Sequence, residues 1–287
     1  MSLELPQKTQ WLVVTYVQLV VFIILLIAFA ILTKIQISKS KDVRSILRFF
    51  IFFFVFLIFK IAGAILGLVL VYESTFTLGV FITTYIFDSI SLGFITRSIA
   101  SLIQHMITQK QKDDEEHFVI NRPTAGKIVD VESQSIPSTI AANNNNQQKT
   151  PLSLAFRVVT LVLLAAIILS IAGTSQLSDG ESSGTPITLV KASSLLFLVG
   201  VLAMIGILIH VIRLGNQFNM VAKILIASLV ILIVRCIYSI LSAFHGIDFG
   251  DPSKYMIFFG NYEYYTFLGL LMEALSAIFI IIAFWFW

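Results

Sequence analysis

Charged side chains are scarce in this sequence: Lys, Arg, Asp and Glu make up 12% of the 287 residues, whereas soluble domains carry about 25%. Hydrophobic residues make up 57%, and the mean hydropathy is +0.94. This balance excludes an ordinary soluble domain and indicates an integral membrane protein. The formal net charge of +3 is small, and we expect no nucleic-acid partner.

Cysteine and histidine are also rare, and the usual catalytic motifs are missing. Cys236 is the single cysteine and lies in an apolar run. With one cysteine, an internal disulfide is excluded. The four histidines show neither HxxxH nor HExxH spacing, which argues against a catalytic zinc site. No GxSxG motif and no glycine-rich phosphate-binding loop occurs. We therefore expect no enzyme activity, no catalytic residues, no metal and no cofactor.

Long apolar runs are abundant by contrast. Seven of them reach about 20 residues or more, the length that crosses a hydrocarbon core of about 30 Å as a helix. The alternating pattern of a membrane β-barrel does not occur. We predict an all-α membrane protein in which residues 1–287 form a single seven-transmembrane helix bundle. The expected spans are 11–33, 49–71, 78–104, 155–174, 187–212, 220–244 and 264–287.

Basic residues in the connections predict the orientation, because cytoplasmic loops carry an excess of Lys and Arg. One side of the predicted bundle has only Lys8 and Lys254, beside the acidic loop TSQLSDGESSGTP. The other side has twelve basic residues, so the N-terminus is expected outside and the C-terminus in the cytoplasm. The twelve are Lys34, Lys39, Lys41, Arg44, Arg48, Lys110, Lys112, Arg122, Lys127, Lys149, Arg213 and Lys223.

Residues 105–154, between the third and fourth spans, form the longest polar segment. This segment contains KDDEEH and AANNNNQQ, and it has too little apolar surface to offset the entropy of ordering. We expect a disordered cytoplasmic loop.

Charged residues inside the predicted spans are the most informative feature, because a charge at the bilayer centre costs roughly 2.5 to 3.5 kcal/mol. Arg97 and Lys191 lie close enough to a span end to extend their charged groups to the interface. The other four lie deeper, at comparable depth, about 14 to 17 Å from a helix end or near the midplane. They are Lys60, Asp88, Arg235 and Glu273, two of each sign.

Each of these four charges shares a helix face with small or polar residues, and a membrane helix turns such a face toward its neighbours. Lys60 aligns with Gly63 and Gly67, Asp88 with Thr84, Ser91 and Ser98, Arg235 with Ser228, Tyr238 and Ser242, and Glu273 with Thr266, Gly269 and Ser276. The four faces predict a polar centre inside the bundle. We expect Arg235 to pair with Glu273, with Asp88 as the competing partner. Lys60 would then take the remaining carboxylate.

Two interpretations of this centre stand beside each other. Lys60, Asp88, Arg235, Tyr238 and Glu273 are candidate binding residues of a ligand or transport site. A neutral buried group of charges is equally typical of a structural clamp that fixes helix register. A rotation of one helix would remove its charge from the group.

Five runs carry a family likeness: KIAGAILGL, FRVVTLVLLAAIILSIAG, LVKASSLLFLVGV, VRCIYSILSAF and LLMEALSAIFIIIAF. In that spacing they resemble a fungal seven-transmembrane domain family of unknown function, over all the spans but not the long loop. The most specific pattern is Arg and Tyr three residues apart, followed by Glu in the seventh span, which gives Arg235, Tyr238 and Glu273. It is more loosely similar to fungal lipid-translocating exporters linked to 7-aminocholesterol resistance. Lys60 departs from the pattern, because we expect Arg there.

The resemblance implies a fold and a fungal source rather than a mechanism. We expect a multi-pass protein, of the plasma membrane rather than internal membranes, that binds or moves an amphiphile or lipid through the polar centre. Membrane lipids are the expected partners, and no oligomeric state is indicated. One alternative is a receptor-like sensor, which the topology fits but which lacks DRY-like and NPxxY motifs. A structural protein with a buried charge clamp is the other.

Overall fold

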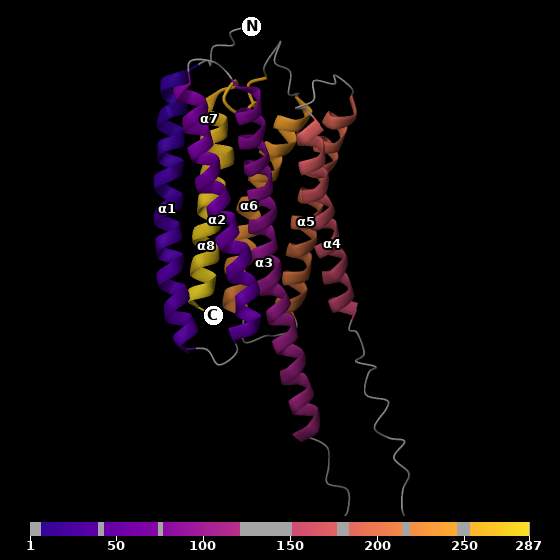
Figure 1. Ribbon diagram of the computed structural model, residues 1–287. Coiled ribbons are helices and arrows are strands. Elements are labelled where there is room, and N and C mark those ends of the chain that lie inside the picture. The colour runs from indigo at the N-terminus through magenta and orange to yellow at the C-terminus, as the bar shows by residue number, and fades with distance from the viewer. Residues whose placement is uncertain are drawn as a thin grey trace, which may run out of the picture.

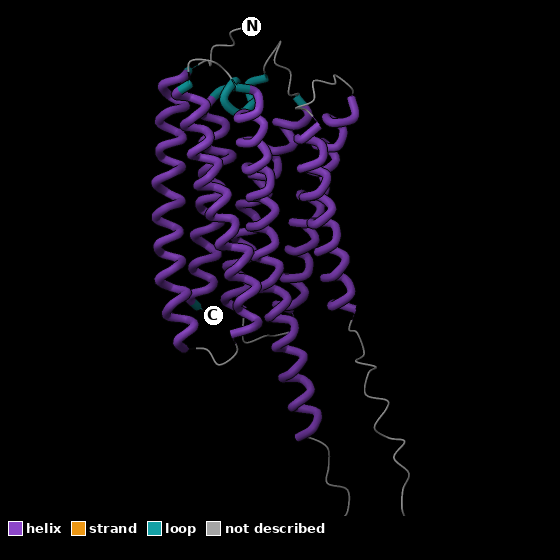
Figure 2. Tube along the Cα trace, viewed as in Figure 1, coloured by secondary structure: helices purple, strands orange, loops and turns teal. Residues whose placement is uncertain are grey.

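A computed structural model of the chain describes residues 7–39, 43–73, 77–120, 151–176, 184–213, 219–245 and 253–286. Within these residues, seven helices are long and apolar enough to cross a membrane, and no strand occurs. The helices run side by side, up and down, so that the two ends of the chain lie at opposite ends of the bundle (Figures 1 and 2). The prediction of an all-α seven-helix membrane protein is confirmed.

The first six spans are single helices, and the seventh is composite. The single helices are α1 (Lys8–Lys39), α2 (Val43–Tyr72), α3 (Leu78–Ile120), α4 (Pro151–Gln176), α5 (Gly184–Arg213) and α6 (Asn219–Phe244). The seventh span consists of α7 (Tyr262–Tyr264), the π-helical stretch η2 (Tyr265–Leu271) and α8 (Met272–Trp285). Lipid cannot satisfy backbone hydrogen bonds, so an apolar run of this length satisfies them within its own helix.

The third helix differs from the sequence expectation. α3 continues to Ile120 and α4 begins at Pro151, so 105–120 and 151–154 are helical, where the sequence suggested disorder. Helix-forming Gln, Lys and Glu dominate 109–116, and residues 105–122 contain neither glycine nor proline. Figure 1 shows the end of α3 projecting beyond the bundle. The remainder of the predicted loop, 121–150, lies outside the described residues.

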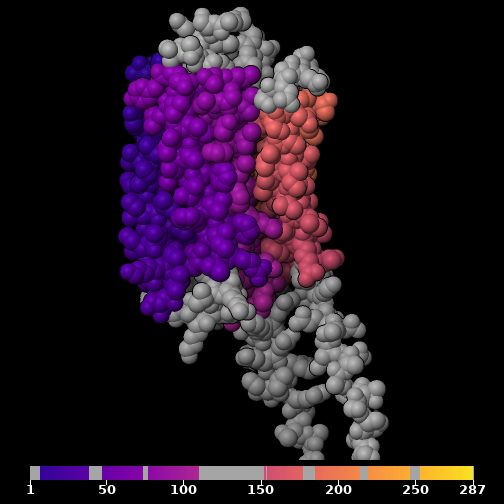
Figure 3. Space-filling model, in the orientation of Figure 1, coloured from indigo at the N-terminus to yellow at the C-terminus, as the bar shows by residue number. Residues whose placement is uncertain are grey.

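Helices adjacent in the chain pack against each other around the bundle, and α1 also contacts α8, which closes the ring. The space-filling view shows α2, α3 and α4 packed side by side (Figure 3). Aromatic side chains fill much of the interior between α1, α2 and α8: Phe29 lies 4.7 Å from Phe53, and Phe49 lies 5.1 Å from Phe284, between ring centres. Such close packing holds membrane helices together where lipid offers no hydrophobic driving force.

Residues 253–260, here called the cap, close the N-terminal end of the bundle. Met256, Ile257, Phe258 and Phe259 are at most 5% exposed. Phe258 has a φ of 68°, a conformation that side chains rarely adopt. Its ring fits against Gly67 of α2, where an added Cβ would approach Phe258 and Thr15 to 3.0 Å. The face that carries Gly67 was expected to contact a neighbouring helix; the structure shows that Gly67 makes room for both Thr15 of α1 and the cap.

Candidate functional site

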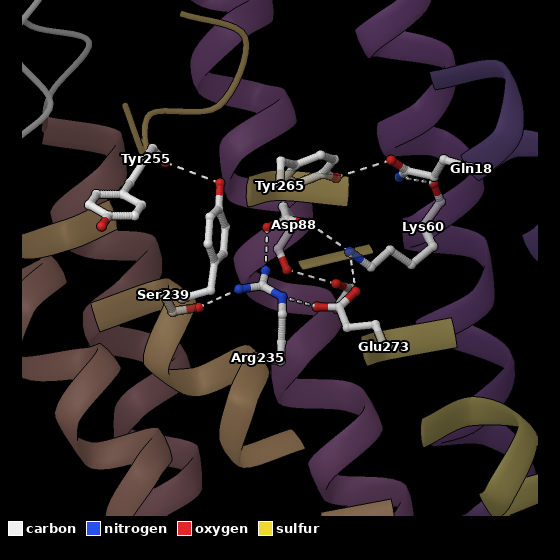
Figure 4. A network of polar contacts seen from close by, with 10 residues as sticks. Gln18, Lys60, Asp88, Arg235, Ser239, Tyr255, Tyr265 and Glu273 are labelled. Carbon is white, nitrogen blue, oxygen red and sulfur yellow. Dashed lines mark hydrogen bonds and ion pairs between the residues drawn. The ribbon is translucent and has the colours of Figure 1, made fainter. Parts of the chain in front are cut away.

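Four buried charged side chains meet inside the bundle, one from each of four helices (Figure 4). Lys60 comes from α2, Asp88 from α3, Arg235 from α6 and Glu273 from α8. Glu273 is 0% exposed, Lys60 and Arg235 are 2% exposed, and Asp88 is 8% exposed. The sequence therefore predicted that these four charges lie at a common depth and meet inside the bundle, whereas their role in binding stays a prediction.

The four charges form a closed ring in which cations and carboxylates alternate. Arg235 Nη2 lies 2.5 Å from Asp88 Oδ2, and Arg235 Nε lies 2.7 Å from Glu273 Oε1. Lys60 Nζ lies 2.6 Å from Asp88 Oδ1 and also pairs with Glu273 Oε2. The predicted Arg235–Glu273 pair is present. The predicted competition is wrong, because the guanidinium presents several N–H donors and reaches both carboxylates at once.

The ring has no net formal charge, because it joins two cations and two carboxylates. Removing an ion from water costs several kcal/mol, and an ion pair offsets this only with good geometry and further hydrogen bonds. Each charge here contacts both charges of opposite sign. Ser239 adds a hydrogen bond, accepting from Arg235 Nη1 at 2.5 Å. Removal of one member therefore leaves each of the two oppositely charged members with only one of its two partners.

The predicted polar faces bring these side chains together. Ser228 of α6 and Ser276 of α8 are hydrogen-bonded through their hydroxyls, 2.6 Å apart. Both are fully buried, and they join the two helices that carry Arg235 and Glu273. Ser91 donates to the Asp88 carbonyl at 2.7 Å. Small polar residues thus allow close contact between helices while their hydroxyls stay satisfied.

Tyr238, the fifth predicted site residue, lies beside the ring rather than in it. Its ring centre is 5.5 Å from Arg235 Cζ, within the range of a cation–π contact. Its hydroxyl donates to the Tyr255 carbonyl in the cap at 3.0 Å. Tyr238 therefore links the charge ring to the cap.

A second set of polar contacts lies beside Lys60. The sequence analysis missed these contacts because it started from the charged residues and the faces that carry them. Tyr265 donates to Gln18 Oε1 at 3.0 Å, and Gln18 Nε2 donates to the Lys60 carbonyl at 3.3 Å. Gln18 is 4% exposed. A glutamine within the apolar run of α1 was the available signal, since a buried polar side chain needs a partner.

The π-helical stretch η2 lies directly before Glu273 in the seventh span. A π-helix has more residues per turn than an α-helix and often occurs at functional sites. Tyr265 and Gly269 of this stretch are buried, as is Glu273. The sequence offered no clear signal for this change of period.

Two small cavities adjoin the ring among the described residues. The larger, about 30 Å³, is bordered by Asp88 and Arg235, and the smaller, about 10 Å³, by Lys60 and Asp88. Eight of the fourteen residues that line the larger cavity carry a hydroxyl group: Tyr85, Ser89, Ser170, Ser193, Ser194, Tyr238, Ser239 and Ser242. A volume of 10–15 Å³ holds one water molecule, so both cavities are of water size. The cap borders each cavity, through Ile257 and Phe258 respectively.

The two remaining charges lie away from the ring, as predicted. Lys191 Nζ lies 5.3 Å from the centre of the Phe244 ring, and Arg97 Cζ lies 5.6 Å from that of Phe52. Both side chains are half-exposed. Within the described part of the chain, no three His, Cys, Asp or Glu side chains are grouped so that they could hold a metal ion.

Comparison with known proteins places the C-terminal part of the chain in a family. No curated protein and no solved structure matches the chain. The matching family model covers α4 to α8 with Arg235, Tyr238 and Glu273, whereas Lys60 and Asp88 precede it. Its match spans residues 135–286, more than half of the chain. The chain therefore belongs to the family described as a domain of unknown function (DUF7702).

Proposed function

We propose that this multi-pass membrane protein binds an amphiphile, and moves it between leaflets, with the polar head of the amphiphile in the larger cavity beside Asp88 and Arg235. The observation that carries the proposal is the hydroxyl-rich wall of that cavity. A clamp needs only charges that pair with one another. The cavity beside the ring is lined by serine side chains from α3, α4, α5 and α6. This arrangement fits a site whose hydroxyl groups form hydrogen bonds with a bound head group.

The chemistry of the wall favours a head group that both donates and accepts hydrogen bonds. Asp88 offers an acceptor and is the most exposed member of the ring. Arg235 offers donors, and a hydroxyl can do either. The ring is neutral, so an uncharged or zwitterionic head enters without leaving excess charge in low dielectric.

The cap is the proposed gate toward the N-terminal side. At about 30 Å³ the cavity holds about two water molecules, so a head group enters only when neighbouring side chains move. Ile257 borders the cavity, and Tyr238 connects the cap to the ring. Displacement of the cap would enlarge the cavity toward that end of the bundle. The looser resemblance of Arg235, Tyr238 and Glu273 to fungal lipid-translocating exporters agrees with lipid movement.

The test is lipid extraction and mass spectrometry of protein purified in a mild detergent. Ser193→Leu adds bulk to the cavity wall and should remove the amphiphile that co-purifies with the wild type. Ser175→Leu is the matched control, because Ser175 is exposed at the end of α4. Identical lipid profiles for wild type and a folded Ser193→Leu protein would contradict the proposal.

The second candidate function is a clamp that fixes the register of α2, α3, α6 and α8. The complete internal pairing of the four charges favours it. A clamp alone predicts that Ser193→Leu changes no bound lipid, so the same experiment separates the two functions. We further propose that the N-terminus lies outside, on the basis of the loop charges, and that the membrane is the plasma membrane.

A further inference from the structure

A basic site, separate from the neutral charge ring, lies on the outer surface of α2, α3 and α4, in the half of the bundle away from the cap. Figure 3 views the molecule from this side. Arg97 of α3 stacks on Phe52 of α2, with 5.6 Å from Cζ to the ring centre. Its Nη1 donates to the Thr160 carbonyl of α4 at 3.4 Å. Arg97 therefore contacts both neighbouring helices at one level of the membrane.

Two further arginines flank Arg97 on the side of the nearer membrane surface. Arg48 precedes Phe52 by four residues on α2, and Arg157 precedes Thr160 by three residues on α4. Residues at these spacings share a helix face, one turn apart. Both arginines are exposed and lie close to the ends of their spans, which begin at Leu47 and Leu154. Arg48 and Arg157 thus lie about one helical turn from the level of Arg97, toward the nearer end of the bundle.

The charges of these arginines are not compensated within the described part of the chain. The ion pairs found there all belong to the buried ring, and no described carboxylate pairs with Arg48, Arg97 or Arg157. Of the five N–H donors of the Arg97 guanidinium, one is used by Thr160. A planar group with free donors at the lipid boundary is suited to bind a phosphate through two parallel hydrogen bonds.

A row of aromatic rings continues from Arg97 toward the middle of the membrane. Phe52 lies 6.3 Å from Phe94, Phe94 stacks on Phe59 at 5.5 Å, and Phe59 meets Phe87 at 5.0 Å, between ring centres. All four side chains are half-buried. They form an apolar strip along α2 and α3 that suits an acyl chain. The strip begins at the arginines and runs toward the middle of the membrane.

We propose that this surface, here called the Arg97 site, binds one anionic phospholipid. The phosphate contacts Arg97 with Arg48 and Arg157 beside it, and an acyl chain follows the phenylalanine row. Basic pockets between membrane helices bind anionic head groups in this way. The Arg97 site is separate from the charge ring, and its occupancy does not depend on the function proposed for the central cavity.

The test is native mass spectrometry of the full chain in detergent, titrated with phosphatidylserine or with phosphatidylcholine of the same acyl chains. We expect one phosphatidylserine to bind in preference. Arg97→Gln should weaken that binding at least about tenfold, as for loss of a charged hydrogen bond. Arg48→Gln and Arg157→Gln should each weaken it about fivefold. These two arginines are exposed, so both variants remain informative if Arg97→Gln fails to fold.

Arg213→Gln is the matched control, because Arg213 is exposed at the same end of the bundle but on α5. It should change the binding less than about twofold, since it lies outside the site. Equal binding of both lipids by the wild type, or an equal loss in Arg213→Gln and Arg157→Gln, would overturn the proposal. If inorganic phosphate alone displaced the phosphatidylserine, the ligand of the Arg97 site would be a free anion and not a lipid.

Discussion

Arg235 makes the largest number of contacts in the charge ring. It binds Asp88, Glu273 and Ser239 through separate nitrogen atoms and lies over the ring of Tyr238. A lysine has a single charged nitrogen and cannot reproduce this fork. Arg235 is therefore tolerated near the middle of an apolar helix, because two carboxylates from other helices pair with its guanidinium there.

The ring predicts coupling between Arg235 and both carboxylates. Arg235→Met or Glu273→Gln alone should cost about 3 to 5 kcal/mol of unfolding free energy, because charges of one sign are left in excess in low dielectric. The combined variant keeps Lys60 paired with Asp88 and should cost clearly less than the sum. Arg235→Met with Asp88→Asn should behave likewise.

The measurement is a double-mutant cycle on detergent-solubilised protein. Lys191→Met combined with Glu273→Gln is the control, and its losses should add, because Lys191 lies on Phe244 outside the ring. Strictly additive losses for Arg235 with Glu273 would show that the ion pair does not exist in the folded protein.

At the scale of elements, the cap and η2 shape the surroundings of the ring. Gly67→Leu should push Phe258 out of its position, because an added Cβ there approaches Phe258 to 3.0 Å. Overpacking of this kind costs about 1 to 3 kcal/mol, so cap opening should become about tenfold or more easier. A cysteine at Ile257→Cys reports opening through its rate of maleimide labelling, and the natural Cys236 is fully buried.

Gly79→Leu is the control for this experiment, since nothing lies within 4 Å of a Cβ added at Gly79. Its labelling rate should match that of Ile257→Cys alone. Fast labelling before any glycine is replaced would mean that the cap is already open.

The π-helical stretch η2 predicts a length effect in the seventh span. Phe267 is 59% exposed, so its deletion removes little packing but returns η2 toward an α-helix. Tyr265 should then rotate away from Gln18 while Glu273 stays in the ring. We expect the deletion to lower the unfolding free energy by at least about 2 kcal/mol more than Phe267→Ala, because buried polar groups lose their partners. Equal losses would mean that η2 has no part in positioning Tyr265.

The sequence predicted the residues of the ring better than its geometry. Lys60, Asp88, Arg235 and Glu273 were identifiable because a charge at depth is costly and each shares a face with small or polar residues. Which charges touch depends on how each helix is rotated and on how far its side chains extend. The residue pattern of one helix determines neither. Two carboxylates therefore looked like competitors for Arg235, although it contacts both.

Uncharged and irregular features were harder to predict. Tyr265, whose hydroxyl donates to Gln18, lies in η2, and the period of a π-helix differs from that of the α-helix on which the pattern was counted. The cap is a short connection outside the predicted spans, yet four of its side chains are buried. The extension of α3 follows helix propensity rather than apolar length.

At the scale of the whole molecule, the bundle is one unit with two distinct ends. The connection after α3 and the connection after α4 leave from opposite ends (Figure 1). An epitope within 133–148 should be protected from protease in intact cells, and one within 176–182 should be cleaved, because the basic residues are twelve on one side and two on the other. The opposite accessibility would reverse the orientation proposed here.

The most direct test of the central claim removes all four charges at once. A variant with Lys60→Met, Asp88→Leu, Arg235→Met and Glu273→Met should fold with a stability close to that of the wild type, because apolar replacement of a complete buried ion cluster is often neutral or stabilising. Stability and co-purified lipid are measured on the same sample. We predict a folded protein that has lost its bound amphiphile. A folded variant that retains the amphiphile at the wild-type amount, or a variant that no longer folds, would contradict the claim that the charges serve binding.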